Sequence, residues 1–571
     1  MSYKNNYTDY PNKIGLFLNE SDDVVLSFPY KDCVLEAGMT KEDAKREKEY
    51  FLHQTRDEMD IATLFAPKAL TNFKYISANA GGGQDSVLEK NIENPDDIEF
   101  WDENGELKQN LLIKGNNLVA LHSLAERLAG KVKLIYIDPP YNTGNDGFSY
   151  FDRFNHASWL TFMKNRLEAA RELLRDDGVI FVQCDDNEQA YLKVLMDEIF
   201  ERENFIWMFM WMKTSTPPSL SRNIRKKLEY LLCFKKNEID KLNGWIVSWW
   251  DMPLLNTWNK IITLNFPPNT VRFNIKDWIY NIWLKDRIEL VEKLEILNWV
   301  NKNNLIIKWP FKWTQETLNK ELNNWTLFII KWEKFAIRYE RLGDRIKVPS
   351  NLISKTECDV WTNEDAKKEL TLLFGHNIFA YPKPENLIKY IIETATNPWD
   401  IVLDYHLGSG TTTAVAHKMG RRWIGVEQMD YIDTIAKERL KKVIAGEQGG
   451  ISKNVNWHGG GDFVYFELKT FNGYFLDEIE KATSKETLKK IYNDMKRSAF
   501  LKFFFDPDDF ENEESENGKK YAQLTLVEQK EKLKGVLDMN HIYLNAGNYD
   551  ETVHTISELD KSLTAKFYGE K

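Results

Sequence analysis

The sequence Leu134-Ile135-Tyr136-Ile137-Asp138-Pro139-Pro140-Tyr141 places a short apolar run directly before an acid, two prolines and an aromatic residue. Such a run, bounded by turn-forming residues, is typical of a buried strand. In an open α/β sheet, ligands bind beyond the carboxyl ends of the strands, and prolines remove backbone donors, so nearby carbonyls stay available as acceptors. Asp138 and one carbonyl could therefore accept hydrogens from the amino group of a planar ring on which Tyr141 stacks. An ordinary strand-to-loop turn is the alternative.

A second strand-to-loop sequence lies much farther along the chain. Residues 401–404 (Ile-Val-Leu-Asp) read as a buried strand that runs into a loop with Gly408 and Gly410, and helix-compatible sequence continues through Met419. Glycines allow a backbone to approach a ligand closely. A further strand over 423–426 then delivers Glu427, at the position where nucleotide-binding folds place an acid for ribose hydroxyls. A lone Gly-x-Gly is weak evidence, but the whole combination predicts a nucleotide-binding loop.

At these residues the chain resembles the amino-group DNA methyltransferases that use S-adenosylmethionine. Residues 138–141 are similar to their catalytic motif and residues 404–410 to their cofactor motif, and the catalytic motif comes first, as in the permuted beta group. Over roughly residues 110 to 470, with gaps, the chain is similar to the modification (Mod) subunit of type III restriction-modification systems. The strings that carry this narrower resemblance are Gly115-Asn116-Asn117-Leu118, Asp138 to Gly144, Trp159 to Leu174, Asp185-Asp186-Asn187-Glu188, Tyr381-Pro382-Lys383-Pro384 and Gly459 to Leu468.

The resemblance implies a Rossmann-like α/β methyltransferase that methylates the N6 amino group of adenine in double-stranded DNA after base flipping. Asp138 and the Pro139 carbonyl would accept the two amino hydrogens, and Tyr141 would stack on the base. The implied catalytic residues are Asp138, Pro139, Pro140 and Tyr141, and the implied cofactor-binding residues are Asp404, His406, Gly408, Ser409, Gly410, Thr411, Glu427, Lys383 and Pro384. No metal is implied.

One position departs from the family's cofactor motif. His406 stands two positions before the first glycine, where the family usually carries an aromatic residue. The backbone of the loop should survive this change, so we expect a working enzyme.

Other functions stay open at this point. The acid before Pro-Pro-Tyr favours adenine over cytosine by resemblance only, and a splayed adenine in RNA would look the same to the site. The chain could act mainly as a recognition and assembly subunit for a nuclease-helicase partner, or as an orphan modifier. Pro95-Asp96 and Glu106-Leu107-Lys108 match a loose magnesium-nuclease pattern, which arises easily by chance. No Gly-x-x-x-x-Gly-Lys-[Ser/Thr] loop is present, so nucleotide-driven translocation would need another chain.

Composition sets broad limits. The 571 residues exceed what one core usually serves, so several folding units are expected. The four cysteines are far apart and suggest neither a zinc site nor disulfides; they are Cys33, Cys184, Cys233 and Cys358. The amino terminus lacks the apolar core of a signal peptide, and no stretch is long enough to span a bilayer. We therefore expect a soluble protein of the reducing cytoplasm.

Charge and aromatic residues are concentrated in one segment. The net charge is −11, but residues 241 to 350 hold 17 Lys and Arg against 11 Asp and Glu, a local net of +6. Eleven of the nineteen tryptophans lie in this part of the chain, at 245, 249, 250, 258, 278, 283, 299, 309, 313, 325 and 332. Aromatic and basic side chains together suit a DNA-contacting surface. The alternative is that most of these tryptophans are buried in an ordinary core.

These patterns divide the chain into five expected regions. They are an N-terminal helical region over 1–80 with a helix-favouring segment from Thr40 to about Arg56, the catalytic half of the methyltransferase domain over 81–240, an inserted α+β target-recognition domain over 241–370, the cofactor half over 371–446, and a mostly helical C-terminal region over 447–571. The acidic loops of the last region suggest a protein contact, and we expect it to form a homodimer.

Overall fold

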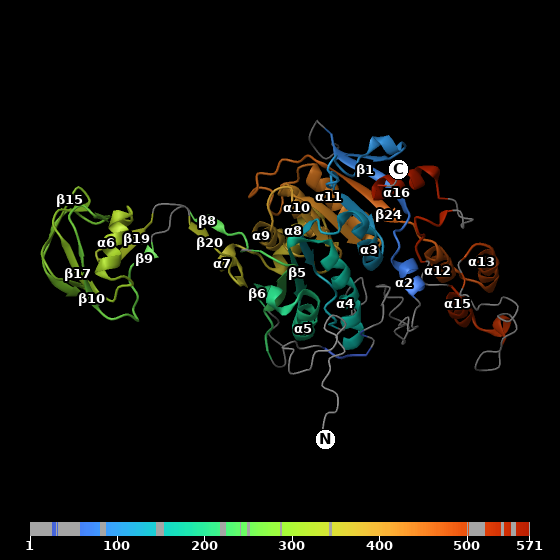
Figure 1. Cartoon of the computed structure of the whole chain (residues 1–571), viewed down its shortest axis with the longest axis horizontal. Helices are drawn as coiled ribbons and strands as arrows, with labels where there is room; N and C mark the ends of the chain where they lie inside the picture. Colours follow the sequence, from blue (N-terminus) through green and yellow to red (C-terminus); the bar gives the residue numbers. More distant parts are fainter. Residues whose placement is uncertain are drawn as a thin grey trace, which may run out of the picture. The chain divides into compact units, whose positions relative to one another are not determined.

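The computed structural model describes residues 26–29, 31, 58–79, 87–143, 154–216, 224–239, 241–247, 252–285, 288–341, 345–499, 501, 520–537, 542–549 and 556–569. The chain forms two compact units (Figure 1). The first contains the chain up to Leu242 and from Ser350 onward, and the second is the insertion Asn243–Pro349.

Within the described residues, the first unit is built on an 11-stranded sheet with the order β2-β1-β24-β3-β23-β22-β4-β5-β7-β6-β21. Its strands are β1 (Leu70–Ala78), β2 (Val87–Asn91), β3 (Leu111–Lys114), β4 (Val132–Ile137), β5 (Leu174–Cys184), β6 (Phe205–Met212), β7 (Leu228–Lys235), β21 (Leu352–Ile353), β22 (Ile401–Asp404), β23 (Arg422–Glu427) and β24 (Asp462–Leu468). The strands from β24 to β5 run parallel to one another, whereas β1 and β7 are antiparallel to their neighbours. The strands predicted from sequence over 134–137, 401–404 and 423–426 are β4, β22 and β23.

Two strands that are distant in sequence lie side by side at the centre. β4 pairs with β22 in parallel, with Leu134 opposite Val402 and Ile135 opposite Leu403. From β4 the chain goes on to β5 on one side, and from β22 it goes on to β23 on the other. Their carboxyl ends therefore form a topological switch point, which is where open α/β sheets bind ligands.

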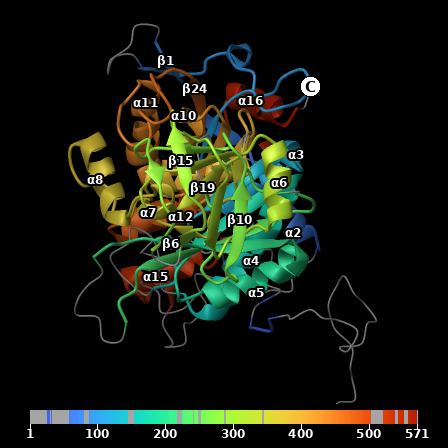
Figure 2. The same ribbon diagram turned by 90° about the vertical axis from the view of Figure 1, so that its left-hand side faces the viewer.

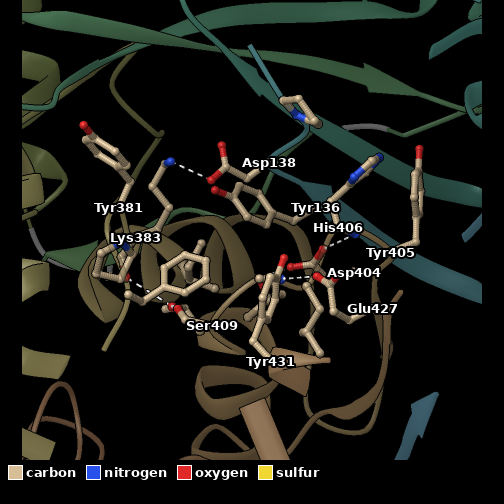
Figure 3. A pocket seen from close by; sticks show the side chains of 18 of the residues that line it. Tyr136, Asp138, Tyr381, Lys383, Asp404, Tyr405, His406, Ser409, Glu427 and Tyr431 are labelled. Atoms are coloured by element: carbon tan, nitrogen blue, oxygen red, sulfur yellow. Dashed lines mark hydrogen bonds and ion pairs between the residues drawn. The ribbon is translucent and has the colours of Figure 1, made fainter. Parts of the chain in front are cut away.

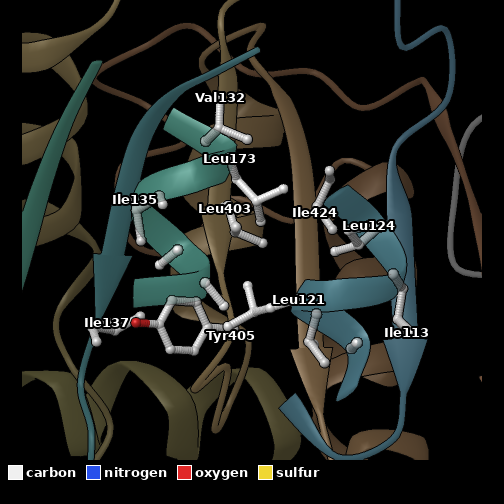
Figure 4. Packing of buried hydrophobic residues seen from close by; sticks show 14 of the residues in the cluster. Ile113, Leu121, Leu124, Val132, Ile135, Ile137, Leu173, Leu403, Tyr405 and Ile424 are labelled. Atoms are coloured by element: carbon white, nitrogen blue, oxygen red, sulfur yellow. The ribbon is translucent and has the colours of Figure 1, made fainter. Parts of the chain in front are cut away.

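Helices cover the two faces of this sheet (Figure 1). One layer consists of α3 (Asn117–Leu128), α4 (His156–Leu173) and α5 (Gln189–Phe200), and the other of α9 (Glu385–Ala395), α10 (Thr411–Lys418) and α11 (Lys437–Ile444). Leu121 and Leu124 of α3 and Leu173 of α4 share one buried cluster with strand residues such as Leu403 and Ile424 (Figure 4). The apolar residues of α4 thus mark the core face of that helix.

The sheet extends farther than the sequence predicted. The N-terminal region was expected to be helical, but among its described residues only α2 (Glu58–Phe65) is a helix, and β1 is a strand of the sheet. The α/β fold was expected to end near Gly446, yet β24 pairs in parallel with β3. The two corrections are linked, because β1 and β24 pair with each other and extend the sheet together on one side. The segment from Thr40 to Arg56 lies outside the described residues.

The inserted unit is shorter than expected, because the chain is back in the first unit well before residue 370. β21 already pairs with β6, and α7 (Lys355–Cys358) and α8 (Asn363–Phe374) follow it. Among its described residues, the insertion contains α6 (Gln315–Asn323), a four-stranded, a seven-stranded and a two-stranded sheet (Figure 2). The strands are β8 (Trp245–Val247), β9 (Met252–Pro253), β10 (Ile262–Phe266), β11 (Val271–Phe273), β12 (Ile279–Tyr280), β13 (Trp283–Lys285), β14 (Ile288–Leu290), β15 (Leu294–Leu297), β16 (Val300–Asn301), β17 (Leu305–Trp309), β18 (Leu327–Ile330), β19 (Ile337–Glu340) and β20 (Arg345–Lys347).

The tryptophans of the insertion are mostly not core residues. Those with more than half of their surface exposed are Trp258, Trp278, Trp299, Trp325 and Trp332. Trp309 is buried, and Trp283 and Trp313 pack against the core of the insertion from its edge. Residues 249 and 250 lie outside the described residues, as does the side chain of residue 245. The alternative that most of these tryptophans are buried is therefore wrong for those whose side chains are described.

The C-terminal part of the chain is largely helical after β24. The helices α12 (Asn472–Lys481), α13 (Lys485–Ser498) and α15 (Leu526–Lys534) share a small apolar core of their own. The last helix, α16 (Glu558–Tyr568), returns to the sheet, where the Thr564 hydroxyl accepts from the Leu70 amide of β1 at 3.0 Å. Among the described helices, none has the length and apolar character needed to cross a membrane.

Replacing Leu403 by alanine should destabilise the first unit by about 2–5 kcal/mol, because this side chain is 0% exposed in the strand that joins the two halves of the sheet. Urea unfolding followed by circular dichroism measures the change. Leu372→Ala in α8 is the matched control, because that side chain is 85% exposed, and it should change the free energy of unfolding by less than about 0.5 kcal/mol. Equal stability of the two variants would contradict the placement of Leu403 in the core.

Candidate active site

A solvent-accessible cavity lies at the switch point, with about 890 Å³ of empty space when the adjoining open solvent is included. It is lined by Asn117, Tyr136, Asp138, Pro140, Phe379, Ala380, Tyr381, Pro382, Lys383, Ile388, Asp404, Tyr405, His406, Leu407, Gly408, Ser409, Thr411, Thr412, Glu427, Gln428 and Tyr431 (Figure 3). Asp138 follows β4 and Asp404 ends β22, so the parallel pairing of these two strands brings both acids into one cavity. The two sequence motifs thus meet as predicted.

Both carboxylate oxygens of Asp138 are engaged. Lys383 Nζ donates to Asp138 Oδ2 at 2.6 Å (Figure 3). The Tyr141 hydroxyl donates to Asp138 Oδ1 at 2.6 Å. Burial raises the pKa of Asp138, and the Lys383 ammonium offsets only part of this effect. Burial also opposes the charge on Lys383, but the carboxylates of Asp138 and Glu229 outweigh it and raise the lysine pKa. An ion pair therefore stands at the centre of the site.

The two prolines differ in what their carbonyls do. The Pro140 carbonyl accepts the indole N–H of Trp159 at 2.7 Å, which ties the loop to α4. No donor to the Pro139 carbonyl is found among the described residues. The proline at 139 removes its own N–H and leaves this carbonyl as an acceptor, as the sequence suggested.

The loop after β22 is folded around the Asp404 side chain. Asp404 Oδ2 accepts the Thr412 hydroxyl at 2.6 Å, and Oδ1 accepts the backbone N–H of His406 at 3.0 Å. Burial raises the pKa of Asp404 to about 7. Gly408 and Gly410 have φ of +55° and +77°, in the left-handed region that favours glycine, and α10 begins directly after them. Asp404 thus shapes the loop whose backbone borders the cavity.

Glu427 is held at the carboxyl end of β23 by backbone amides. Its Oε2 accepts the N–H of Gly408 at 2.9 Å, and its Oε1 accepts those of Gln428 and Met429 at 2.9 and 3.0 Å. These bonds fix the buried carboxylate at the cavity wall. An acid in this position beside a glycine loop suits the vicinal hydroxyls of a ribose.

A buried cluster of charges supports the loop from behind. Arg439 of α11 donates to the Thr411 hydroxyl at 2.8 Å and to Glu385 at 2.9 Å. Glu385 also pairs with Lys418 of α10 at 2.7 Å. Removing one member of such a cluster leaves an unpaired charge inside the protein, so the cluster ties α9, α10 and α11 to the position of the loop.

His406 behaves as a neutral aromatic ring. Its ring is half-buried, and its centroid lies 5.9 Å from that of Phe162 and 5.1 Å from that of Tyr405. Burial, aided by the nearby Arg166 guanidinium, holds the pKa of His406 well below its usual range. The departure from the family motif therefore preserves an uncharged ring at this position.

Most predicted site residues line the cavity, and some do not. Pro139, Tyr141, Gly410 and Pro384 are not in its wall, although each is adjacent to a residue that is. The sequence reasoning missed the aromatic side chains Tyr136, Phe379, Tyr405 and Tyr431. Tyr136 could have been found, because it precedes Asp138 by two positions and so shares its side of the strand. The chemical roles of the predicted residues stay predictions.

The suspected nuclease motif does not form a metal site. Asp96, Glu106 and Lys108 are exposed, and Glu106 and Lys108 pair instead with Lys131 and Glu99, at 3.7 and 3.8 Å. No group of three or more potential metal ligands occurs in the described part of the chain. Cys184 and Cys233 are buried and free, Cys358 is free and partly buried, and Cys33 lies outside the described residues.

Comparisons with known proteins give the family of the chain. The DNA methylase family matches residues 132–438. The chain is 35% identical to the probable type III restriction-modification enzyme HindVI Mod subunit of Haemophilus influenzae, over 99% of this chain and 88% of that protein. It is 32% identical to the EcoPI Mod subunit of Escherichia phage P1, over 54% of this chain and 55% of that protein. Among solved structures, PvuII DNA methyltransferase (cytosine-N4-specific) matches 58% of this chain and 86% of that chain, with 14% identity and a TM-score of 0.33.

The family model covers more than half of the 571 residues, and the Haemophilus relative aligns with almost the entire chain. The chain therefore belongs to the DNA methylase family and, within it, to the Mod subunits of type III restriction-modification enzymes.

Proposed function

We propose that this Mod subunit is a site-specific DNA methyltransferase that transfers a methyl group from S-adenosylmethionine to the N6 amino group of adenine in double-stranded DNA. The observation that carries the proposal is the single cavity shared by Asp138, Asp404 and Glu427. It places an amino-group acceptor and a nucleoside-binding loop within one space. No other described part of the chain combines these features.

The cavity fits S-adenosylmethionine. A Cβ added at Gly410 would lie 3.2 Å from Ala436 Cβ and 3.3 Å from Ala436 Cα, so the close fit of the loop depends on glycine. Glu427 would hold the ribose hydroxyls, the loop from Asp404 to Thr411 the methionine part, and Lys383 and Pro384 would lie on the cofactor side. When bound, the cofactor supplies an electrophilic methyl group.

The acceptors of the first motif would hold the target base. The Asp138 carboxylate accepts a hydrogen bond from one amino hydrogen, and the Pro139 carbonyl accepts one from the other. These two bonds direct the nitrogen lone pair out of conjugation with the ring. Tyr141 would stack on the flipped base. Asp138 must be ionised to accept, and its pairing with Lys383 favours the charged form.

The inserted unit would read the DNA sequence. Its 16 Lys and Arg against 11 Asp and Glu, a net of +5, suit phosphate contacts, and its exposed tryptophans suit contacts with bases. For the C-terminal helices we propose a homodimer contact, and for the assembled protein a nuclease-helicase partner. Sedimentation of the purified chain, alone and with a candidate partner, measures both associations.

Asp138→Ala should lower the rate of methyl transfer to DNA at least about 100-fold, because the amino group loses its charged acceptor. Transfer of radiolabelled methyl groups in a single turnover measures the rate, and the affinity for S-adenosylmethionine should stay within about 3-fold. Asp96→Ala is the control, because Asp96 is exposed and belongs to the rejected nuclease motif, and it should keep the rate of the unchanged protein. Full activity of Asp138→Ala would refute the assigned role.

Gly410→Ala should weaken binding of S-adenosylmethionine at least about 10-fold, because the loop must move away from Ala436. Titration calorimetry measures the affinity. Gly420→Ala is matched in backbone conformation, with φ of +67°, but a Cβ there meets nothing within 4 Å. Strain alone should affect the stability of both variants, whereas only Gly410→Ala should lose affinity. Equal affinities would place the cofactor elsewhere.

A further inference from the structure

A second buried acid lies behind the catalytic carboxylate. Glu229 of β7 is 4% exposed, and it lies beside the central strands because β7 pairs with β5. Its Oε2 accepts the Gln183 side-chain amide at 2.7 Å and lies 3.1 Å from the Tyr141 hydroxyl. Its Oε1 accepts from Lys213 Nζ at 3.2 Å. A carboxylate held by this many partners has one defined orientation.

Glu229 shares two of its partners with Asp138. The Tyr141 hydroxyl lies between the two acids, 2.6 Å from Asp138 Oδ1 and 3.1 Å from Glu229 Oε2. Lys383 Nζ is 2.6 Å from Asp138 and 3.9 Å from Glu229 Oε2. A hydroxyl has one hydrogen to donate, so Tyr141 can serve only one carboxylate at a time. Both shared donors stand closer to Asp138 in this structure.

When the amino group of a target base binds at Asp138, Lys383 and Tyr141 need another hydrogen-bond acceptor. Both oxygens of Asp138 are already engaged, so a base that donates to Asp138 must displace or weaken one of the two contacts. A displaced ammonium or hydroxyl inside the protein needs another acceptor, because an unsatisfied buried polar group is costly. Glu229 Oε2 is the acceptor that already lies near both donors.

We propose that Glu229 is a positioning residue for methyl transfer, which takes over Lys383 and Tyr141 when Asp138 engages the amino group of the target base. The inference rests on the proposed function and extends it to a residue outside the motifs. Glu229 itself touches neither the base nor the cofactor in this scheme. It lets Asp138 change partners without leaving a charge or a hydroxyl unpaired.

The surrounding charges support this role. Lys213, just after the end of β6, pairs with Glu229 Oε1, whereas Lys383 lies 3.9 Å from Oε2, so the two acids and two lysines balance. Burial opposes the charge on Glu229, but Lys383 and Lys213 outweigh it and lower the glutamate pKa. Burial and, to a smaller extent, the charge of Glu229 also raise the pKa values of Asp185, Cys184, Tyr136 and Tyr141. Glu229 is therefore ionised and able to accept.

Glu229→Gln tests the proposal with a side chain of the same shape and no charge. The single-turnover rate of DNA methylation should fall about 10- to 100-fold, because Lys383 and Tyr141 then lack a charged acceptor when the base occupies Asp138. The affinities for S-adenosylmethionine and for DNA should change by less than about 3-fold. Glu89→Gln is the matched control. Glu89 lies on β2, at the opposite end of the sheet, and pairs with Lys74 and Lys441, so this variant should keep the rate of the unchanged protein.

The pH profile separates positioning from a merely structural role. The rate should rise with pH as Asp138 becomes ionised, because burial raises the Asp138 pKa and the charge of Glu229 raises it further by repulsion. Removing that charge lets Asp138 ionise at lower pH, so the acid limb of Glu229→Gln should shift to lower pH. Glu229→Asp keeps the charge, and its acid limb should stay with that of the unchanged protein.

Three outcomes would overturn the inference: an unchanged rate in Glu229→Gln, an unshifted acid limb, or an equal loss in Glu89→Gln. If Glu229→Gln does not fold, a full rate and an unshifted profile in Glu229→Asp support the need for charge, whereas a loss of cofactor affinity in that variant overturns the assigned role. If the unchanged protein methylates no DNA while it binds the cofactor, the proposed function itself fails.

Discussion

The parallel pairing of β4 with β22 is the constraint on which the site depends. It joins segments separated by most of the catalytic half and the entire insertion, and it fixes their carboxyl ends next to each other. The pairing is held by apolar side chains such as Leu403 and Ile135, not by the polar residues that line the cavity. The chemistry is thus placed by a core that takes no part in it, which lets the loops carry charged and strained residues.

Charges inside the first unit are arranged in two groups around this core. In front, Lys383 links Asp138 to Glu229, and behind the glycine loop Arg439 links Thr411 to Glu385. Isolated charges would be costly at such depth, so each group is kept balanced. Lys383 carries a further connection, because its carbonyl accepts the Thr411 hydroxyl at 3.2 Å. The Asp138 side of the cavity and the glycine loop are therefore connected through one residue.

Local patterns in the sequence predicted the central strands and the two loops that meet at the cavity, and nine of the predicted site residues line it. They did so because a short apolar run followed by an acid or a glycine loop has few other structural solutions. The edge strands β1 and β24 were missed, since their pairing is a long-range property. Glu229 was missed because a single acid in an otherwise apolar strand is visible as a partner of Asp138 only after β7 is placed beside β5. The exposed tryptophans show that composition alone does not predict burial.

The pairing of β1 with β24 sets the order in which the molecule can be completed. Tyr75 lies opposite Val464, so β1 can pair early with β2, but its other edge has no partner until nearly all of the intervening chain has left the ribosome. Contacts of such high contact order form late, and an unpaired strand edge is prone to associate with other chains. During synthesis the early segment must therefore be kept from aggregating, and expression at reduced temperature or with chaperones should favour the recovery of native protein.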